Sequence, residues 1–220
     1  MSIDLNDLRS NQEKIAQHIV LDDNFNNPPS RIAGSDIAFI NGRGVCACVI
    51  VQLPDLQVVE TSIIINEITF PYITEYLAFR EANSVISAYK QLKEQPDILL
   101  VNAHGFAHPR FCGAASHIGV LLNTATIGVA SNNLCGIYRQ EPLETGDAVM
   151  CTHLGKTVGY IFKSKKKCRP IFVSPGNKVS MLSAISIVKL CMGTHKMPEP
   201  IYLAHIEANK VRQEELTASL

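Results

Sequence analysis

The sequence predicts an α/β layer protein whose mixed sheet begins antiparallel and continues parallel, with helices on both faces. Three β-rich runs follow one another with short turns between them, which is the pattern of an antiparallel meander. A helical pattern comes next and leads into Ile98–Val101, which is apolar at every position. A run without alternation is typical of a strand covered on both sides, and helices that alternate with such strands indicate parallel pairing.

The first element is a predicted amphipathic helix over residues 5–20, followed by a loop through residues 22–30. Apolar side chains recur in this first segment at near-helical spacing. They are Leu5, Leu8, Ile15 and Ile19. The loop contains Asn26-Asn-Pro-Pro29, a cluster typical of irregular structure.

The meander is predicted to contain the strands Arg31–Ile40, Val45–Leu53 and Val58–Glu67. Asn41-Gly-Arg-Gly44 separates the first two strands. It is a strong hairpin signal, because glycine and asparagine tolerate the backbone conformations of tight turns. Pro54-Asp55 marks the second turn.

A helix is predicted from Glu75 to Glu94, after a break at Pro71-Tyr-Ile-Thr74. Its apolar stripe consists of Leu77, Val85, Ala88 and Leu92. Glu81 falls within that stripe, four residues from apolar positions on either side. Burying a carboxylate is costly unless it is paired or bound to a metal ion, so this position is unusual.

Short strands and helices alternate in the C-terminal half. The predicted elements are a helix at Ala115–Leu122, a strand at Thr126–Ala130, a hairpin through Val149–Cys151 and Val158–Phe162, a strand at Ile171–Val173, a helix from Ser174 to Met192 and a last helix from Pro198. The last helix carries His205, and we expect it to fray after Gln213. With no repeat and no linker, residues 1–220 are predicted to form one domain.

The composition limits the function classes. The 20 basic and 20 acidic residues cancel, so a nucleic-acid partner would have to be met by a local patch of charge. No apolar run approaches the ~20 residues of a bilayer span, and the first residues lack a signal pattern. Seven cysteines without a CxxC pair indicate buried thiols in a reducing compartment. We expect a soluble protein of the cytoplasm, or also of the nucleus in a eukaryote, with no membrane partner.

Two acids interrupt apolar rows on separate elements. Asp36 lies in the apolar row of one strand face, and Glu81 lies in the helix stripe. Taken singly, Asp36 could be a solvated or capping acid, and Glu81 could belong to a salt bridge. Together they are better explained by a cation between them, because neighbouring carboxylates repel. Hard oxygen ligands suit Mg²⁺ or Mn²⁺, which can activate water and stabilise charge on a phosphate.

The turn after Ile98–Val101 lies where open α/β sheets place their ligands. Asn102 offers an amide oxygen there, although a turn-forming asparagine explains the residue equally well. An alternative is a zinc site made of His104, His108, Cys112 and His117. That site would leave both acids unexplained. His205 has apolar neighbours, and for such a residue a core histidine is the more frequent reading.

These stretches resemble the endonuclease V family from about Ala33 to Asn209. The matching motifs are Ala33-Gly-Ser-Asp36-Ile-Ala, Pro71-Tyr-Ile73, Leu77-Ala-Phe-Arg-Glu81, His104-Gly-Phe-Ala-His-Pro-Arg110, Ala115-Ser-His-Ile-Gly-Val-Leu121, Thr126-Ile-Gly-Val-Ala130, Leu134-Cys-Gly136, Val173-Ser-Pro-Gly176 and Leu203-Ala-His205. The resemblance implies an RNase H-like fold and, on the family's precedent, a monomer. It also implies cleavage of DNA or RNA containing inosine or deoxyinosine, at the second phosphodiester bond on the 3′ side of that base.

The resemblance also implies roles for single residues. The expected catalytic residues are Asp36, Glu81, His108 and His205. The expected ligands of Mg²⁺, or of Mn²⁺ as a substitute, are Asp36, Glu81, Asn102 and His205. The expected nucleic-acid contacts are Tyr72 and Ile73 in a wedge that fills the gap left by a flipped base, Ala103, His104 and Gly105 around that base, and Arg80 and Ser131.

Four positions depart from the family pattern. The family has Asp-Gly-His-Gly or a close variant where this chain has Asn102-Ala-His-Gly105, so the third carboxylate is an amide and an ion should bind more weakly. Ala103 adds a methyl group and restricts the backbone relative to glycine, which could narrow the base pocket. Ser131 replaces a lysine that would face a phosphate, and Thr74 stands where the wedge usually has proline.

Three functional hypotheses follow. The first is a metal-dependent endonuclease with weakened activity, and the second is a catalytically impaired relative that still binds nucleic acid. The third is a nuclease retuned to another lesion or to RNA. The basic run Lys163–Arg169 could follow phosphates or could be a solvated hairpin, and the sequence leaves this open.

Overall fold

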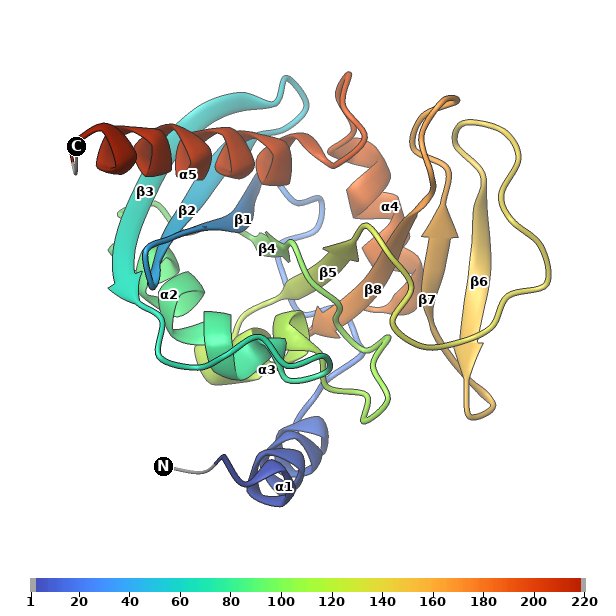
Figure 1. The fold of residues 1–220 in the computed structure, drawn as a ribbon. Helices are drawn as coiled ribbons and strands as arrows, with labels where there is room; N and C mark the ends of the chain where they lie inside the picture. Colours follow the sequence, from blue (N-terminus) through green and yellow to red (C-terminus); the bar gives the residue numbers. More distant parts are fainter. Residues whose placement is uncertain (1–2, 219–220) are drawn as a thin grey trace.

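The computed structural model describes residues 3–218, in which eight strands form one mixed sheet with helices on both faces (Figure 1). The strand order is β3-β2-β1-β4-β5-β8-β7-β6. The strands are β1 (Arg31–Ile40), β2 (Arg43–Gln52), β3 (Gln57–Glu67), β4 (Ile98–Val101), β5 (Thr126–Ala130), β6 (Ala148–His153), β7 (Lys156–Phe162) and β8 (Ile171–Asn177). The helices are α1 (Leu5–Ala16), α2 (Leu77–Gln91), α3 (Ala114–Leu122), α4 (Met181–Leu190) and α5 (Glu199–Ala218).

The pairing confirms the predicted mixed sheet. β1, β2 and β3 form the antiparallel meander, and β4 pairs in parallel with both β1 and β5. Beyond β5 the sheet becomes antiparallel again, because β8 runs against β5 and the hairpin of β6 and β7 extends from β8. The parallel strands therefore lie in the middle of the sheet.

Two hydrophobic layers enclose the central strand β4. On one face α4 and the start of α5 pack on Ile98 and Leu100, and on the other α2 and α3 pack on Leu99 and Val101 (Figure 1). None of these four side chains is more than 3% exposed. The continuous apolar run is explained by this burial on both sides.

α1 forms where a helix was predicted, but it ends at Ala16 rather than at residue 20, and its apolar stripe is not what holds it. Leu5 is 44% exposed, whereas Gln12 is 1% exposed and is the residue of this helix that is buried. α1 lies at the outside of the molecule beside α3 (Figure 1). A helix in this position has little apolar surface to cover, so its docking depends on the hydrogen bonds of Gln12.

The predicted helix start at Ser174 is wrong. Ser174, Pro175 and Asn177 pair with β5 and extend β8, while α4 begins at Met181 with Ser180 as its N-cap. The local Ser-Pro-Gly sequence is compatible with a helix start, but strand pairing overrides it. α5 also continues to Ala218, past the end expected at Gln213.

Two further observations concern the composition. All seven cysteines are free thiols, and four of them are fully buried. Within residues 3–218, no helix combines the length and apolar character needed to cross a bilayer.

Candidate active site

The end of β4 creates the opening in which the candidate site lies. In the parallel pair, Ser35 of β1 lies opposite Val101, where β4 stops. β1 continues to Ile40, so its edge has no β4 partner from Asp36 onward. Because Asn102 directly follows the last residue of β4, the register brings Asp36 and Asn102 side by side.

Asp36 accepts a hydrogen bond on each carboxylate oxygen. The Nδ2 of Asn102 donates to Oδ1 at 2.7 Å, and the Nδ1 of His205 lies 2.7 Å from Oδ2. The Asp36 side chain is 10% exposed, whereas that of His205 is 56% exposed. His205 is therefore a rim residue at Asp36, and the reading as a core histidine was wrong.

α5 reaches Asp36 because it begins directly on β1. Gly34 makes this approach possible, since a Cβ there would lie 2.2 Å from the carbonyl carbon of Pro200. From that contact, the first two turns of α5 carry His205 to the carboxylate. Asn209, one turn later, donates from Nδ2 to the His205 carbonyl oxygen at 2.8 Å.

Glu81 lies near the start of α2 and is half-buried. Burial, followed by the charge of Asp36, raises the pKa of Glu81 to about 7, and Arg80 opposes this shift. The charge of Asp36 thus acts on Glu81 although the two carboxylates come from different elements. In the described part of the chain, no side chain or backbone group hydrogen-bonds to the Glu81 carboxylate.

The donor set fits one hard divalent cation better than zinc. Asp36 and Glu81 repel each other, and a cation near both would stabilise both charges. The amide oxygen of Asn102 and the ring of His205 complete the donors at this opening. Three of the four donor groups offer oxygen, the hard ligand that Mg²⁺ and Mn²⁺ prefer, and the fourth is an imidazole nitrogen. With an amide in place of a third acid, this set carries two negative charges.

The zinc alternative is contradicted. Across residues 3–218, no three His, Cys, Asp or Glu side chains form a group that could hold a metal ion, which applies to Asp36, Glu81 and His205 as well as to the zinc set. The Nε2 of His104 is hydrogen-bonded to the Asn132 carbonyl oxygen at 2.9 Å, and that of His108 to the Glu75 carbonyl oxygen at 2.9 Å. His117 instead packs edge-on against Phe79.

A hollow of about 480 Å³ opens beside Asn102. Its walls are residues 72–75, residues 102–104 and residues 130–134, together with His108 and the start of α3. Five of the seven residues predicted to contact nucleic acid line it, namely Tyr72, Ile73, Ala103, His104 and Ser131. Tyr72 is 70% exposed and stands at the rim, where an aromatic ring can reach a base.

The other two predicted contacts lie outside this hollow. Gly105 packs against β8, because its N–H donates to Ser174 Oγ at 2.9 Å and a Cβ would lie 2.2 Å from the Pro175 carbonyl oxygen. Arg80 donates from Nη1 to the Phe70 carbonyl oxygen at 2.5 Å and lies 4.3 Å over the Phe39 ring. It braces the segment that leads into the wedge.

Two of the positions that depart from the family pattern, Ala103 and Ser131, lie at the hollow. Ala103 has no positive φ, so the alanine carries no backbone strain and acts on the hollow only through its methyl group. Ser131 is exposed on the rim, and its hydroxyl points to the Met197 sulfur at 3.9 Å.

His108 supports the wedge from below. It is 1% exposed, and its Nε2 donates to the Glu75 carbonyl oxygen while its Nδ1 accepts from the Arg110 N–H at 3.2 Å. Burial lowers the pKa of His108 to about 4, so the ring is neutral at pH 7. It lines the hollow, and it is hydrogen-bonded to neither Asp36 nor His205.

Sequence reasoning missed a second support of the wedge. Gln12 of α1 donates from Nε2 to the Glu75 carbonyl oxygen at 2.8 Å and accepts from Arg110 Nε at 2.7 Å. Arg110 Nη1 in turn lies 2.9 Å from Glu75 Oε2. Glu75 itself has φ of +72° and needs such support. Gln12 lies in a polar helix and gave no signal, whereas Arg110 ends one of the motifs quoted above.

Comparisons with known sequences and solved structures identify the family of this chain. The sequence model of the family described as Endonuclease V matches residues 13–206. The endonuclease V of Streptomyces avermitilis is 29% identical, with a TM-score of 0.89 over 98% of this chain and 96% of that chain. The catalytic domain of human endonuclease V is 26% identical, with a TM-score of 0.88 over 97% of each chain.

A third structure contains nucleic acid. The Ciona intestinalis endonuclease V, in complex with a 24mer DNA containing an inosine followed by a ribo-adenosine, is 28% identical. Its TM-score is 0.84, over 96% of this chain and 98% of that chain. The mixed sheet with helices on both faces is thus the RNase H-like fold of these structures, and the chain belongs to the endonuclease V family.

Proposed function

We propose that this protein is a divalent-metal-dependent endonuclease that acts on DNA or RNA containing inosine or deoxyinosine. In this proposal it cuts the second phosphodiester bond on the 3′ side of that base, with activity weakened by Asn102. Family membership supports a nuclease, and the Ciona relative bound to inosine-containing DNA supports the substrate. A monomer in the cytoplasm remains our expectation.

The proposal depends most on the groups that meet at Asp36. Asp36, Asn102 and His205 form a hydrogen-bonded set at the open edge of β1, and Glu81 lies near enough for its pKa to respond to the Asp36 charge. The hollow lined by Tyr72 and Ala103 adjoins this set. A base held in the hollow would leave its backbone at the rim, beside these polar groups.

Each residue then has a defined task. Asp36 and Glu81 would hold Mg²⁺ or Mn²⁺, with Asn102 and His205 beside them, and the ion would activate water and stabilise charge on the phosphate. Glu81 must lose its proton before it can act as a ligand. His108 positions the wedge through the Glu75 carbonyl, and Tyr72 fills the gap left by the base.

Asn102 gives a physical reason for weakened activity. An aspartate at this position would bring a third negative charge to the ion, whereas the amide brings none. The Asn102 amide also donates a hydrogen bond to Asp36, so Oδ1 of this expected metal ligand already has a partner. An ion must therefore compete with this hydrogen bond.

The same hydrogen bond favours a second candidate function. Because Asn102 and His205 satisfy both oxygens of Asp36, this carboxylate is stable without a cation. A relative that binds inosine-containing nucleic acid without cutting it would keep the hollow and the wedge and would need no ion. The two candidates differ in one measurable property, which is cleavage.

The test compares the wild-type chain with Asn102→Asp, and with Asp36→Ala as the inactive control. Each protein is incubated with single-stranded DNA and RNA that contain one inosine, and with matched adenosine strands, in Mg²⁺ and in Mn²⁺. We expect slow wild-type cleavage of the inosine strands alone, and at least tenfold faster cleavage by Asn102→Asp.

The outcomes separate the candidates. Wild-type cleavage would exclude the non-catalytic function, and cleavage by Asn102→Asp alone would assign the impairment to the amide. If neither protein cuts, Asn102→Asp is combined with Ala103→Gly and Ser131→Lys. Binding without cleavage by that triple variant would contradict the endonuclease proposal.

A further inference from the structure

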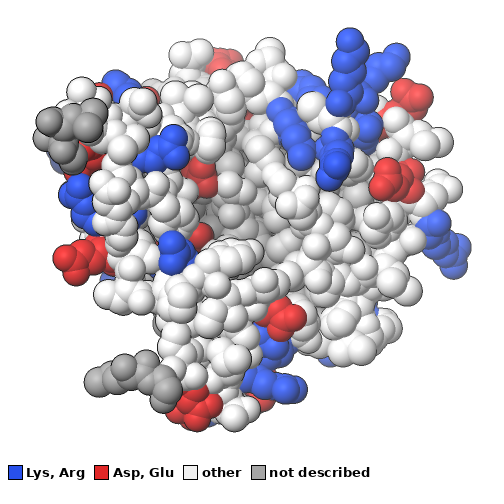
Figure 2. All heavy atoms as spheres, in the orientation of Figure 1, with Lys and Arg blue, Asp and Glu red and all other residues white. Residues whose placement is uncertain are grey.

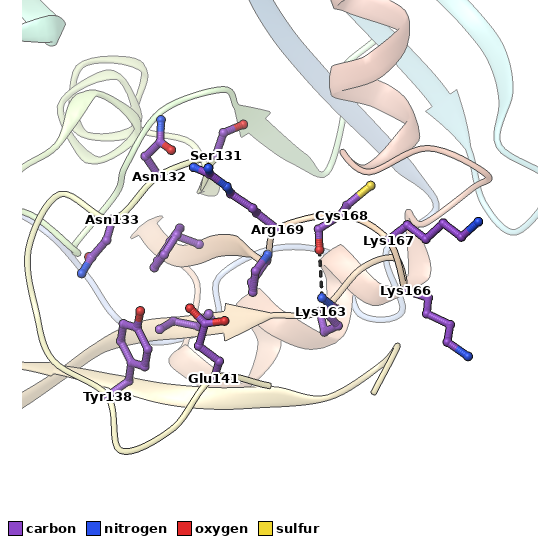
Figure 3. Close-up of a pocket in the computed structure, with 13 residues that line it drawn as sticks. Ser131, Asn132, Asn133, Tyr138, Glu141, Lys163, Lys166, Lys167, Cys168 and Arg169 are labelled. Carbon is purple, nitrogen blue, oxygen red and sulfur yellow. Dashed lines mark hydrogen bonds between the residues drawn. The ribbon is translucent and has the colours of Figure 1, made fainter. Parts of the chain in front are cut away.

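A second hollow, of about 590 Å³, adjoins the first (Figure 3). Residues 131–133 line both hollows, so they form the ridge between them. The far wall of the second hollow is residues 166–170, in the loop between β7 and β8. A chain molecule that leaves the first hollow over this ridge enters the second one directly.

The second hollow is strongly basic. Lys163, Lys166, Lys167 and Arg169 line it, with Glu141 as the single acid among its lining residues. Figure 2 shows a gathering of basic side chains at the upper right, where Figure 1 places the loop between β7 and β8. The whole chain has no net charge, so this local excess is of the kind that attracts a phosphate backbone.

The cations of this loop do not have equal roles. Lys163 donates to the Cys168 carbonyl oxygen at 2.9 Å, and Lys165 donates to the Gly193 carbonyl oxygen at 2.7 Å, so these two fix the shape of the loop. Lys166 and Lys167 extend away from the ridge (Figure 3). Arg169 alone extends across the hollow toward Ser131.

Arg169 also has no anionic partner. Among residues 3–218, no acid forms an ion pair with it, and its side chain is exposed. A guanidinium group offers a planar fork of N–H donors that matches two oxygens of one phosphate. Ser131 lines the same hollow, and its hydroxyl carries no charge and lies 3.9 Å from the Met197 sulfur.

We propose that Arg169 binds a backbone phosphate of the nucleic-acid strand where that strand crosses the ridge at residues 131–133. The inference rests on the proposed function, because it assumes that the first hollow holds a base of that strand. Arg169 thereby supplies, from the loop between β7 and β8, the positive charge that Ser131 does not provide. Tyr138, half-buried in the same hollow, offers a ring on which the next base can stack.

The test measures binding without cleavage. A fluorescent single-stranded 20-mer with one central deoxyinosine is titrated by anisotropy in EDTA with the wild type, Arg169→Ala, Arg169→Glu, and Lys166→Ala/Lys167→Ala as the matched control from the same loop. We expect Arg169→Ala to weaken binding about fivefold and Arg169→Glu more, whereas the lysine pair, which only adds to the general attraction of the hollow, should weaken binding less than Arg169→Ala does. The slope of log K against log salt should fall by about 0.7 in Arg169→Ala, as for one phosphate on a single strand.

A rescue variant makes the assignment specific. Adding Ser131→Lys to Arg169→Ala should restore most of the lost affinity, because the new ammonium group reaches the same ridge. Equal weakening by the lysine double variant, or no change in Arg169→Ala, would overturn the inference, as would absent binding by the wild type. Cleavage of the same strand in Mn²⁺ is scored separately, so that a cutting wild type with unchanged Arg169→Ala binding refutes the inference alone.

Discussion

At the scale of the residue, the surroundings of Glu81 disfavour the ionised form of its carboxyl group. Its pKa is near 7 in the fold, because of burial and then of Asp36, against an ordinary value of 4.5. Between these two values the folded chain holds a proton that the unfolded chain has lost. The free energy of unfolding must therefore fall as pH rises through this window.

Glu81→Gln tests this opposition directly, since glutamine keeps the shape and removes the charge. Without metal, we expect the variant to have a Tm about 3 °C above that of the wild type at pH 8. We expect no such difference at pH 4, where Glu81 is largely protonated in both the folded and the unfolded wild type. Thermal unfolding in EDTA at the two pH values measures this. The same Tm difference at both would contradict a raised pKa, and Mn²⁺ at pH 8 should stabilise the wild type more than the variant.

The residues of the site were predictable to different degrees. Asp36 and Glu81 could be found because a charged side chain in an apolar row breaks a periodic pattern. His205 was found through the family resemblance alone, since its neighbours in sequence are apolar while its ring is 56% exposed. Gln12 was not predictable, because it bonds to a backbone carbonyl 63 residues away, and such a contact leaves no pattern in either segment.

At the scale of the element, α1 acts as a clamp on the wedge rather than as a layer of the core. Gln12, His108 and Arg110 all meet the backbone carbonyl oxygen of Glu75, at 2.8, 2.9 and 3.4 Å. Three donors from two distant segments thus converge on one acceptor at a residue with positive φ. The wedge is positioned by the scaffold below it, not by its own sequence.

Gln12→Ala should loosen this clamp. We expect a loss of about 1–3 kcal/mol in the free energy of unfolding, because the buried partners of Gln12 lose their hydrogen bonds. Arg9→Ala is the matched control on the same helix, since its ion pair with Glu13 is exposed on both sides and should contribute little to the free energy of unfolding. Urea unfolding of the three proteins gives the comparison, and equal losses in both variants would show that α1 is held by its surface instead.

The elements show which sequence signals determine structure here. Asn41-Gly42 correctly marked the first hairpin, and Ile98–Val101 correctly marked the doubly covered strand, because both signals are local. β8 is longer than predicted, because pairing with β5 holds its last residues in a strand although their local sequence is compatible with a helix start. The return to antiparallel pairing beyond β5 had no sequence signal, since pairing order is decided by segments far apart.

At the scale of the whole molecule, the site forms where three parts of the fold meet. β1 supplies Asp36, α5 on one face supplies His205, and α2 on the other face supplies Glu81. They can meet because β4 is only four residues long and leaves the edge of β1 open. The segment from the end of β4 through α3 then closes the hollow from below, and it contains three histidines.

These histidines make the closing segment sensitive to acid. Burial lowers the pKa of His104, His108 and His117 to about 4 each, from 6.5. Between pH 6.5 and pH 4 the unfolded chain binds protons that the folded chain excludes, so the free energy of unfolding falls as pH falls. Three such groups outweigh the opposite effect of Glu81, and the protein should lose stability below pH 6.

His117→Leu isolates one of them, because the buried Nδ1 of the His117 ring has no hydrogen-bond partner within residues 3–218 and leucine has a similar volume. We expect the variant to gain stability relative to the wild type when urea unfolding is moved from pH 7.5 to pH 4.5, since leucine has no proton to bind. Ile118→Val, a buried and uncharged change on the same helix, should cost about 1 kcal/mol at both pH values. If His117→Leu shows the same pH-independent difference as this control, the buried imidazole does not contribute to acid unfolding, and the closing segment is not where it begins.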